Sequence, residues 1–312
     1  MPDGTSGSGS SPSISVVMPA YRSGDTVAVA LDSIRDQSLP VAEILVVDDA
    51  SPDTTVERAN AWLAAAGGGW HGRVIRLPRN AGPAAARNAG IRAATGAWIA
   101  FLDADDAWLP WRLERQFAVL AEAPDTGFVC GETIPFESEP VSPTAGPPPR
   151  ELTPVDFVAH NPVATSTVLV RRSALDTVGG FDERFRGPED YDLWLRLSGH
   201  VHGLLLNEPL ARYRHVVGSL SMDDRRFLPE VLRVLDKAFG PGGALEAYRG
   251  SRRVALAEQY ASASWMAYRR GARGTALRLL LASWRYCPGP IAREQRGERR
   301  LRLTLLGRYL AK

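Results

Sequence analysis

Short apolar runs alternate with amphipathic stretches along the N-terminal third of the chain. The runs, rich in β-branched residues, cover 14–18, 43–47, 74–77 and 98–102. Stretches with helical spacing lie between them at 25–36, 54–66 and 83–94. Strands that alternate with helices of about 10 to 15 residues are typical of βαβ units, whose neighbouring strands are parallel. The pattern therefore predicts an α/β fold with a mixed, mostly parallel sheet flanked by helices.

The pattern is less regular further along the chain. It predicts a mobile Pro- and Ser-rich loop at 137–149. Two strands are predicted at 164–170 and 202–206, and a helix is predicted at 188–197. From residue 223 onward, apolar side chains recur at helical spacing, which predicts a helical C-terminal region over 223–312. Residues 1–13 are dominated by Gly and Ser and are typical of a disordered leader. We therefore expect the α/β domain to span 14–222.

The charge of the chain is unevenly distributed, although its net value is only +2. Residues 249–312 hold 15 Lys and Arg against three Glu, so the rest of the chain is net acidic. A basic region behind an acidic body suggests contact with a polyanion. An anionic membrane surface, a nucleic acid and a phosphorylated ligand are all candidates for that partner.

Two features of the composition indicate the cellular compartment. No apolar run approaches the roughly 18 residues of a membrane-spanning helix, and no secretory signal pattern opens the chain. The two cysteines, Cys130 and Cys287, are too few for a disulfide framework or a Cys-rich metal site. We therefore expect a cytoplasmic protein.

Aspartates follow two of the predicted strands, at the position where parallel sheets bind ligands. Asp48 and Asp49 follow the second run, and Asp103, Asp105 and Asp106 follow the fourth. Because the carboxyl ends of parallel strands meet at one edge of a sheet, we expect these carboxylates to converge. Such a cluster is costly unless a cation shares it, so the pattern indicates a divalent metal site with oxygen ligands.

The segment after the first run argues against other nucleotide-binding folds. PAYRSG at 19–24 is not the G-x-G-x-x-G of a dinucleotide site, and no G-x-x-x-x-G-K-[ST] follows it. It is also a poor version of the Gly-rich basic loop that a sugar-nucleotide-forming nucleotidyltransferase needs for its triphosphate. A non-enzymatic nucleic-acid-binding protein is the other alternative, but the basic region lacks interleaved aromatic residues. Both alternatives stay open on this evidence.

Several segments, in order, resemble a family 2 glycosyltransferase of the GT-A fold. They are SVVMPAY, ILVVDDAS and RNAGPAAARNAGIRAATGAWIAFLDADD, followed by GGFDE and GPEDYDLW within 179–194, which are similar to the family's acceptor-side block. The resemblance covers about residues 14–221. It implies an inverting, metal-dependent enzyme that takes a sugar from a nucleoside diphosphate, with a nucleotide-binding half at 14–106 and an acceptor half at 107–222.

The resemblance also implies roles for individual residues. Asp103-Ala104-Asp105 is the family's D-x-D motif, in which Asp105 would bind Mn²⁺ or Mg²⁺ at the diphosphate, and His215 could reach the same metal. Asp190 would be the general base that takes the acceptor's proton, with Glu189 beside it. The nucleotide would be bound by Pro19, Tyr21, Asp48, Asp49, Arg87, Asn88, Asp103 and Ala104.

The expected activity is the transfer of a single hexose-type sugar to a hydroxyl group in surface polysaccharide or glycolipid biosynthesis. The chain lacks the membrane helices and the Q-x-x-R-W motif of the related processive synthases. Uridine is the family's commonest base, so we expect a UDP-sugar donor and a glycan or lipid-linked acceptor. The basic region 249–312 predicts peripheral contact with the inner face of the cell membrane, and no nucleic-acid partner is expected.

Overall fold

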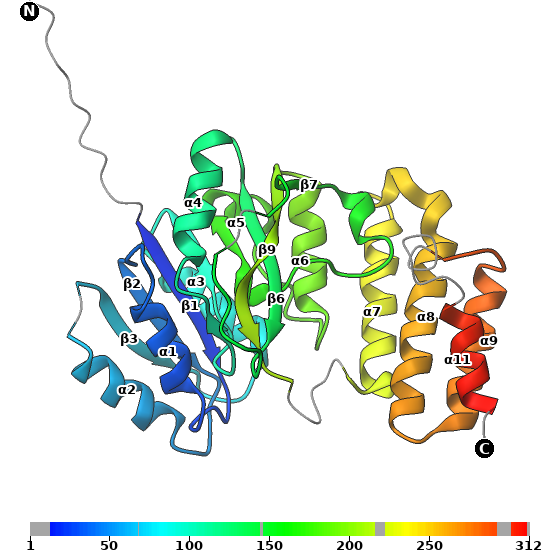
Figure 1. Cartoon of the computed structure of the whole chain (residues 1–312), viewed down its shortest axis with the longest axis horizontal. Coiled ribbons are helices and arrows are strands. Elements are labelled where there is room, and N and C mark those ends of the chain that lie inside the picture. Colours follow the sequence, from blue (N-terminus) through cyan, green and yellow to red (C-terminus); the bar gives the residue numbers. More distant parts are fainter. Residues whose placement is uncertain (1–12, 68, 144–145, 216–221, 292–300, 311–312) are drawn as a thin grey trace, which may run out of the picture.

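A computed structural model describes residues 13–67, 69–143, 146–215, 222–291 and 301–310 of the chain. A mixed sheet with helices on both faces forms one part of the molecule, and a layer of C-terminal helices forms the other (Figure 1). All but the last residue of the predicted leader lies outside the described residues. No helix in the described ranges is long and apolar enough to cross a membrane.

The sheet has nine strands among the described residues, in the order β3-β2-β1-β4-β8-β6-β9-β5, with β7 paired to β9. Their bounds are β1 Ile14–Ala20, β2 Glu43–Asp48, β3 His71–Arg76, β4 Trp98–Phe101, β5 Ala107–Trp108, β6 Phe128–Pro135, β7 Arg150–Leu152, β8 Leu169–Arg171 and β9 Gly203–Tyr213. The first four strands pair in parallel, as predicted. In the second half only β6 and β9 are parallel, so the sheet is mixed but parallel pairs do not predominate there.

Helices connect the strands and continue to the end of the described chain. Their bounds are α1 Val27–Arg35, α2 Thr55–Ala65, α3 Pro83–Ala93, α4 Arg112–Glu122, α5 Arg172–Val178, α6 Glu189–Ser198, α7 Asp224–Phe239, α8 Arg252–Arg269, α9 Arg273–Tyr286 and α11 Leu301–Leu310. Short 3₁₀ helices occupy Pro154–Phe157, Thr165–Thr167 and Glu246–Ser251. The predicted α/β fold with a helical C-terminal region is therefore confirmed.

Alternate residues of the central strands face two separate hydrophobic cores. Val17 of β1 and Phe101 of β4 belong to the core that α3, α5 and α6 cover. Their neighbours Val16 and Ala100 belong to the core that α1, α2 and α4 cover. Because successive side chains of a strand point to opposite faces, strands buried on both faces appear in the sequence as continuous apolar runs. This is the reason that these strands could be predicted from the sequence.

Helix α3 lies unusually close to the sheet because Gly90 has no side chain. A Cβ atom at Gly90 would lie 2.4 Å from Cγ1 of Val17 on β1, well inside the distance that real contacts allow. Arg87 lies one turn earlier on the same helix and is buried. The close approach of α3 therefore brings this arginine against the carboxyl edge of the sheet.

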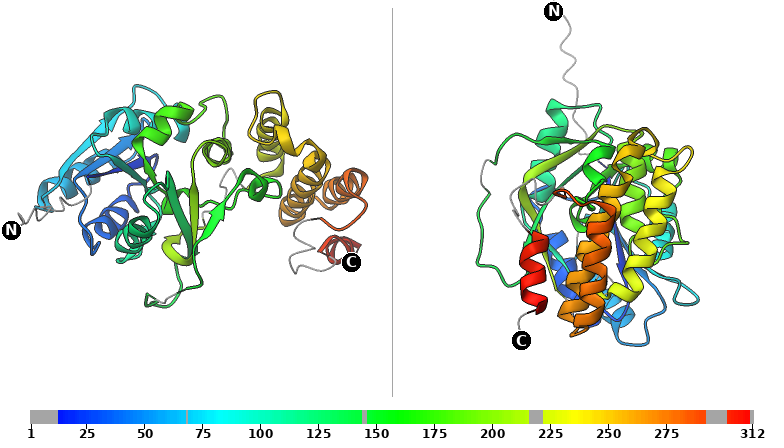
Figure 2. Two further views of the ribbon diagram at one scale, coloured as in Figure 1. Left: turned by 90° about the horizontal axis from the view of Figure 1, so that it is seen from above. Right: turned by 90° about the vertical axis from the view of Figure 1, so that its right-hand side faces the viewer.

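The C-terminal helices α7, α8, α9 and α11 stand side by side, and α6 lies between them and the sheet (Figures 1 and 2). Lys237 of α7 forms ion pairs with Asp182, at 2.9 Å, and with Asp192 of α6, at 2.7 Å. Gln259 of α8 donates a hydrogen bond to the carbonyl of Ala159, which precedes β8. The helical region thus packs against the α/β part through specific polar contacts.

Two predictions for the second half of the chain were wrong in detail. The segment 164–170 is not one strand, because Thr165–Thr167 forms a 3₁₀ turn and only Leu169–Arg171 joins the sheet. The strand predicted at 202–206 continues to Tyr213. Both differences arise from long-range partners, since Ser166 bonds to residues near position 103 and β9 pairs with three other strands.

The Pro- and Ser-rich segment predicted as a loop has no helix or strand between Phe136 and β7 in its described part. Arg212 of β9 donates hydrogen bonds to the carbonyls of Phe136 and Ser138 at the start of this loop. The loop therefore begins attached to the sheet.

Candidate functional site

The strands β1 and β2 end together at the edge of the sheet where the sequence places Pro19 and Tyr21. Two residues that follow these strands, Arg22 (φ 53°) and Ala50 (φ 56°), have the left-handed backbone conformation although neither is glycine. Such strained positions are concentrated at binding sites, where surrounding contacts hold them. Tyr21 leaves 43% of its surface exposed at this edge, so its ring is accessible to a ligand.

Asp48 and Asp49 are buried at the end of β2 and have partners within the protein. Asp48 lies 3.3 Å from Nε of Arg76 and accepts hydrogen bonds from the backbone N–H of Ser51. Asp49 accepts hydrogen bonds from the N–H groups of Ala81 and Gly82, just before α3. These carboxylates hold together the loops around the strand ends, and direct contact of either with a nucleotide stays a prediction.

Arg87 connects the two acidic motifs that the sequence placed far apart. Its Nη2 lies 2.7 Å from Oδ1 of Asp103, and its Nη1 lies 2.9 Å from Oε1 of Glu189. Burial opposes the charge of this guanidinium, but the two carboxylates outweigh the burial and raise its pKa. A buried, charge-assisted cluster of this kind has a defined geometry, so Arg87 fixes the first turn of α6 against the D-x-D motif.

The residues 103–106 form a tight acidic turn that two side chains from elsewhere stabilise. The hydroxyl of Ser166 accepts from the N–H of Asp103 and donates to Asp106 at 2.6 Å. Arg214 donates its backbone N–H to Asp106 and its Nε to the carbonyl of Asp105. Burial, together with the charge of Asp103, raises the pKa of Asp106 to about 7 and also raises that of Asp105.

Asp190 stands at the start of α6 with its carboxylate in a network of donors. Its Oδ2 accepts hydrogen bonds from Nδ2 of Asn161 at 3.0 Å and from the hydroxyl of Thr165 at 3.4 Å. Burial and the neighbouring charge of Glu189 raise the pKa of Asp190 to about 7, although Arg87 acts in the opposite direction. A carboxyl group with a pKa near neutrality is well suited to accept a proton.

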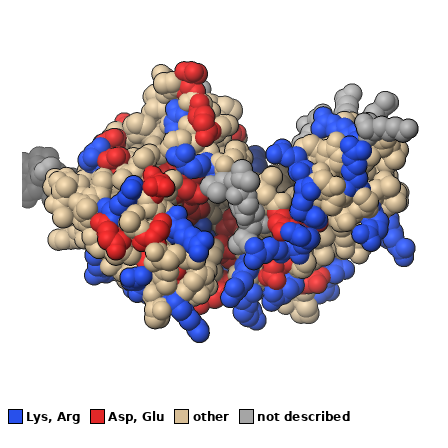
Figure 3. Space-filling view, turned by 90° about the horizontal axis from the view of Figure 1, so that it is seen from below, with Lys and Arg blue, Asp and Glu red and all other residues tan. Residues whose placement is uncertain are grey.

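These groups line one cavity of about 420 Å³, which we call the acidic cleft. Its acidic side is formed by Asp103, Asp106, Glu189 and Asp190, with Arg87 among them. Its other side is formed by residues of α7 and α8, including Gln259, Ser262 and Met266. Figure 3 shows acidic side chains inside a hollow, with Lys and Arg side chains gathered on the neighbouring C-terminal helices.

Eight predicted site residues do not line this cavity: Pro19, Tyr21, Asp48, Asp49, Asn88, Ala104, Asp105 and His215. Asn88 exchanges hydrogen bonds with the backbone of Phe181 and donates to Glu183, so it fixes the GGFDE segment. His215 is exposed and its ring packs edgewise on Tyr213, with 5.1 Å between the ring centroids. It lines a separate cavity beside Asn161. The nucleotide role of Asn88 and the metal role of His215 therefore stay predictions.

A metal at this site would depend on ligands from a bound molecule. Within the described ranges, no group of three or more His, Cys, Asp and Glu side chains could hold a metal ion. The donor chemistry nevertheless fits a divalent cation, because Asp105 is partly buried and no other described residue donates a hydrogen bond to its carboxylate. A cation between this carboxylate and a diphosphate would relieve the desolvation that raises its pKa.

Sequence reasoning missed several residues of the site. Asn161 and Thr165 contact Asp190, Ser166 and Arg214 contact the acidic turn, and Ser262 of α8 lines the cleft. The Asn-Pro pair at 161–162 followed by Thr-Ser-Thr was a signal for a turn rather than a strand. Nothing in the spacing of α8 indicated that it faces the cleft.

Comparison with known sequences returns glycosyltransferases from several bacteria. The chain is 30% identical over 219 residues to the putative teichuronic acid biosynthesis glycosyltransferase TuaG of Bacillus subtilis, covering 67% of this chain and 82% of TuaG. It is 28% identical to WfaP of Escherichia coli, a UDP-Glc:α-D-GlcNAc-diphosphoundecaprenol β-1,3-glucosyltransferase, covering 67% and 79%. It is 26% identical to an uncharacterized glycosyltransferase of Haemophilus influenzae, where the match covers 63% of this chain and 66% of that protein.

Solved structures of two glycosyltransferases share the fold. Residues 1–349 of S. aureus TarS in complex with UDP-GlcNAc superpose with a TM-score of 0.64 at 18% identity, covering 87% of this chain and 81% of that one. The mannosyltransferase PcManGT of Pyrobaculum calidifontis, in complex with GDP-Man and Mn²⁺, superposes with a TM-score of 0.61 at 20% identity, covering 95% and 79%. The predicted GT-A fold is therefore confirmed.

Two family models match the chain itself. The model described as Glycosyltransferase like family 2 matches residues 151–242, which include α6 and Asp190. The model described as Glycosyl transferase family 2 matches residues 15–179, which include β1 to β4 and the acidic turn. Since the match at residues 15–179 covers more than half of the sequence, the chain belongs to glycosyltransferase family 2.

Proposed function

We propose that the protein transfers a single sugar from a nucleoside diphosphate to a hydroxyl group of an acceptor, with inversion at the anomeric carbon. The observation that carries this proposal is the acidic cleft, in which Asp190 lines the same cavity as Asp103 and Asp106 of the acidic turn. One end can hold a sugar diphosphate and the other can accept a proton. The family, and the UDP-sugar and GDP-sugar named for WfaP, TarS and PcManGT, support this function.

The donor would bind along the carboxyl ends of β1, β2 and β4. The exposed ring of Tyr21, beside Pro19, offers a surface on which a base can stack. Asp103 and Ala104 would meet the ribose, and Asp105 would hold Mn²⁺ or Mg²⁺. When bound, this metal neutralises the negative charge that grows on the leaving diphosphate. The relatives' donors make a UDP-sugar the first choice.

Asp190 would act as the general base. Its carboxylate takes the proton of the acceptor hydroxyl while that oxygen attacks the anomeric carbon and the diphosphate leaves from the opposite face. Asn161 and Thr165 orient the carboxylate by donating to Oδ2. Glu189 is engaged with Arg87 and with the N–H of Gly187, so its role is to position the first turn of α6.

The acceptor would be a glycan or lipid-linked molecule at the inner face of the cell membrane. Arg278, Leu281 and Arg285 lie on one exposed side of α9, with Leu281 leaving 54% of its surface in solvent. Two cations that flank an exposed apolar side chain favour adsorption to anionic lipid. The acceptor for which WfaP is named is itself lipid-linked, which supports this location.

The proposal is tested by measuring binding and hydrolysis of UDP-, dTDP- and GDP-sugars with Mn²⁺ or Mg²⁺. One donor should bind only in the presence of metal. The variant Asp105→Ala should lose that binding, whereas Asp190→Asn should bind the donor normally and fail to turn it over. Failure of every nucleotide sugar to bind under any metal would overturn the proposal.

A further inference from the structure

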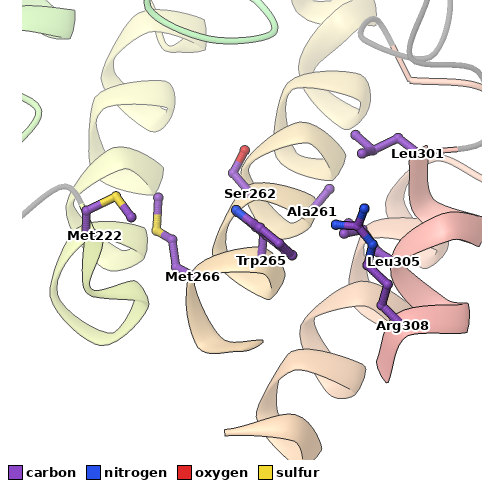
Figure 4. A pocket seen from close by; sticks show the side chains of 8 residues that line it. All are labelled: Met222, Ala261, Ser262, Trp265, Met266, Leu301, Leu305 and Arg308. Carbon is purple, nitrogen blue, oxygen red and sulfur yellow. The ribbon is translucent and has the colours of Figure 1, made fainter. Parts of the chain in front are cut away.

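A further cavity lies next to the acidic cleft, between α8 and α11, and we call it the α8–α11 pocket (Figure 4). It has a volume of about 430 Å³, within the range of roughly 300 to 1,000 Å³ that small-molecule sites occupy. Its walls are mainly apolar and come from Ala261 and Trp265 of α8, Leu301 and Leu305 of α11, and Met222.

The pocket and the acidic cleft share part of their walls. Ser262 and Met266 of α8 line both cavities. In Figure 4 the side chain of Met266 lies toward Met222, on the side of α8 that faces α7. The two cavities therefore adjoin each other at these two side chains.

The two cavities have opposite chemistry. The cleft is lined by the four carboxyl groups of Asp103, Asp106, Glu189 and Asp190. Among the described residues that line the pocket none is acidic, and the charged residue there is Arg308, whose guanidinium lies 5.6 Å from the ring centroid of Trp265. A polar sugar chain needs donors and acceptors along its length, and this lining offers them only at Ser262, Trp265 and Arg308, whereas a hydrocarbon chain needs only apolar surface.

We propose that the α8–α11 pocket binds the hydrocarbon chain of a lipid-linked acceptor whose sugar hydroxyl reaches Asp190. This inference rests on the proposed transferase function and narrows its acceptor from glycans in general to lipid-linked ones. The pocket removes the first part of the hydrocarbon chain from water. The exposed side of α9 would keep the protein at the membrane from which that lipid comes.

The binding test uses farnesyl diphosphate, with 15 carbons, and isopentenyl diphosphate, with five, as probes. Both are titrated calorimetrically in the presence of saturating UDP and Mn²⁺, so that the diphosphate site of the donor is already filled. The wild-type chain should bind the longer probe at least tenfold more tightly. Both probes carry the same diphosphate and differ chiefly in hydrocarbon length, so the difference in affinity reports the apolar contact.

Met222→Glu is the informative variant because Met222 leaves 45% of its surface exposed, so the charge enters the pocket without burial in the core. It should reduce the affinity for farnesyl diphosphate to that for isopentenyl diphosphate, and Met222→Leu should retain the wild-type affinity. Val29→Glu, at a similarly exposed position on α1 outside the pocket, is the matched control and should bind within twofold of wild type.

Circular dichroism and UDP binding on the same samples verify that each variant is folded. An equal loss in Met222→Glu and Val29→Glu would overturn the pocket in favour of general surface adsorption. Absence of a chain-length preference in the wild-type chain would also overturn it and leave the pocket to a segment of the protein itself. Hydrolysis of the donor by the wild-type chain is measured in parallel, because its absence would point instead to failure of the proposed transferase function.

Discussion

The pKa of Asp190 connects the geometry of a single residue with the pH dependence of the reaction. Burial and Glu189 raise this pKa to about 7, and the base works only when deprotonated. We therefore expect kcat/KM to rise with pH and to level off above about 7. Asn161→Ala removes a hydrogen bond to the carboxylate, favours the protonated form and should move the rise upward by about one pH unit.

The control for this shift is Asn207→Ala on β9, which removes a hydrogen bond to the carbonyl of Pro148. This variant should leave the pH profile unchanged. The measurement is the pH profile of kcat/KM for the three proteins between pH 5 and 9. A profile of Asn161→Ala that coincides with the wild type would contradict the assignment of Asp190 as the titrating base.

The raised pKa of Asp190 also predicts a stability cost. Its folded pKa, about 7, lies above the value of 3.8 in the unfolded chain, so its stabilising contribution is complete below pH 3.8 and is lost as pH rises through 7. Asp190→Asn escapes this loss and should be more stable than wild type at pH 8, by about 1 to 3 kcal/mol. Thermal melting at pH 5 and pH 8 checks this, and a gain that shrinks at high pH would contradict it.

Arg87 is expected to be the most important single residue for the stability of the site. Arg87→Ala leaves Asp103 and Glu189 without their buried partner and should cost about 3 to 5 kcal/mol of unfolding free energy. Arg225→Ala breaks an ion pair with Asp223 at the surface and should cost far less, because solvent screens that pair. Urea denaturation compares the two variants, and equal costs would show that the buried cluster is not coupled to folding.

At the scale of single elements, the start of α6 decides where Glu189 and Asp190 lie. Gly187 has φ 112°, and its N–H donates to Glu189 just before the helix begins. Gly187→Ala forces a side chain into this conformation and should cost about 1 to 3 kcal/mol of stability. Because the carboxylate of Asp190 moves with the helix, kcat should fall by about tenfold to a hundredfold while donor affinity is retained.

The control for this element is Gly274→Ala on α9, where a Cβ meets no other atom within 4 Å. That variant should leave kcat unchanged and raise stability by up to about 1 kcal/mol, since alanine favours helices. Steady-state kinetics and denaturation of both variants make the measurement. Unchanged kcat in Gly187→Ala would mean that the first turn of α6 does not position the base.

At the scale of the whole molecule, the basic C-terminal helices are part of the site rather than an appendage. Helix α8 lines the acidic cleft, so deletion of 249–312 would remove a wall of the cleft together with the basic charges. Membrane contact is better tested with the double variant Arg278→Glu and Arg285→Glu on the exposed side of α9. Each basic residue near an anionic surface contributes about 1 kcal/mol, so the variant should bind at least tenfold more weakly.

Flotation with vesicles of phosphatidylcholine and phosphatidylglycerol measures this binding, and vesicles of phosphatidylcholine alone serve as the control. The wild-type chain should float with the anionic vesicles only, and donor binding should be equal in both proteins. Equal flotation of the variant and the wild type on anionic vesicles would rule out this side of α9 as the membrane surface.

The sequence by itself determined the α/β fold, the order of the first elements and the position of the acidic motifs. Strands buried on both faces, such as β1 and β2, appear in the sequence as continuous apolar runs, and helices appear as apolar residues at helical spacing. Both patterns are contained in a short stretch of sequence. The D-x-D turn and the Glu-Asp pair could be found because they are short segments with fixed spacing.

Only the tertiary structure decided which of these residues act together. Arg87 and Glu189 are 102 residues apart, and Thr165, a partner of Asp190, comes from a 3₁₀ turn that the local pattern favoured as a strand. The contribution of Ser262 and Met266 to the cleft, and the apolar pocket behind them, depend on how α8 packs against α7 and α11. A periodic pattern records which face of an element is buried but not what lies against that face, because the partner is distant in sequence.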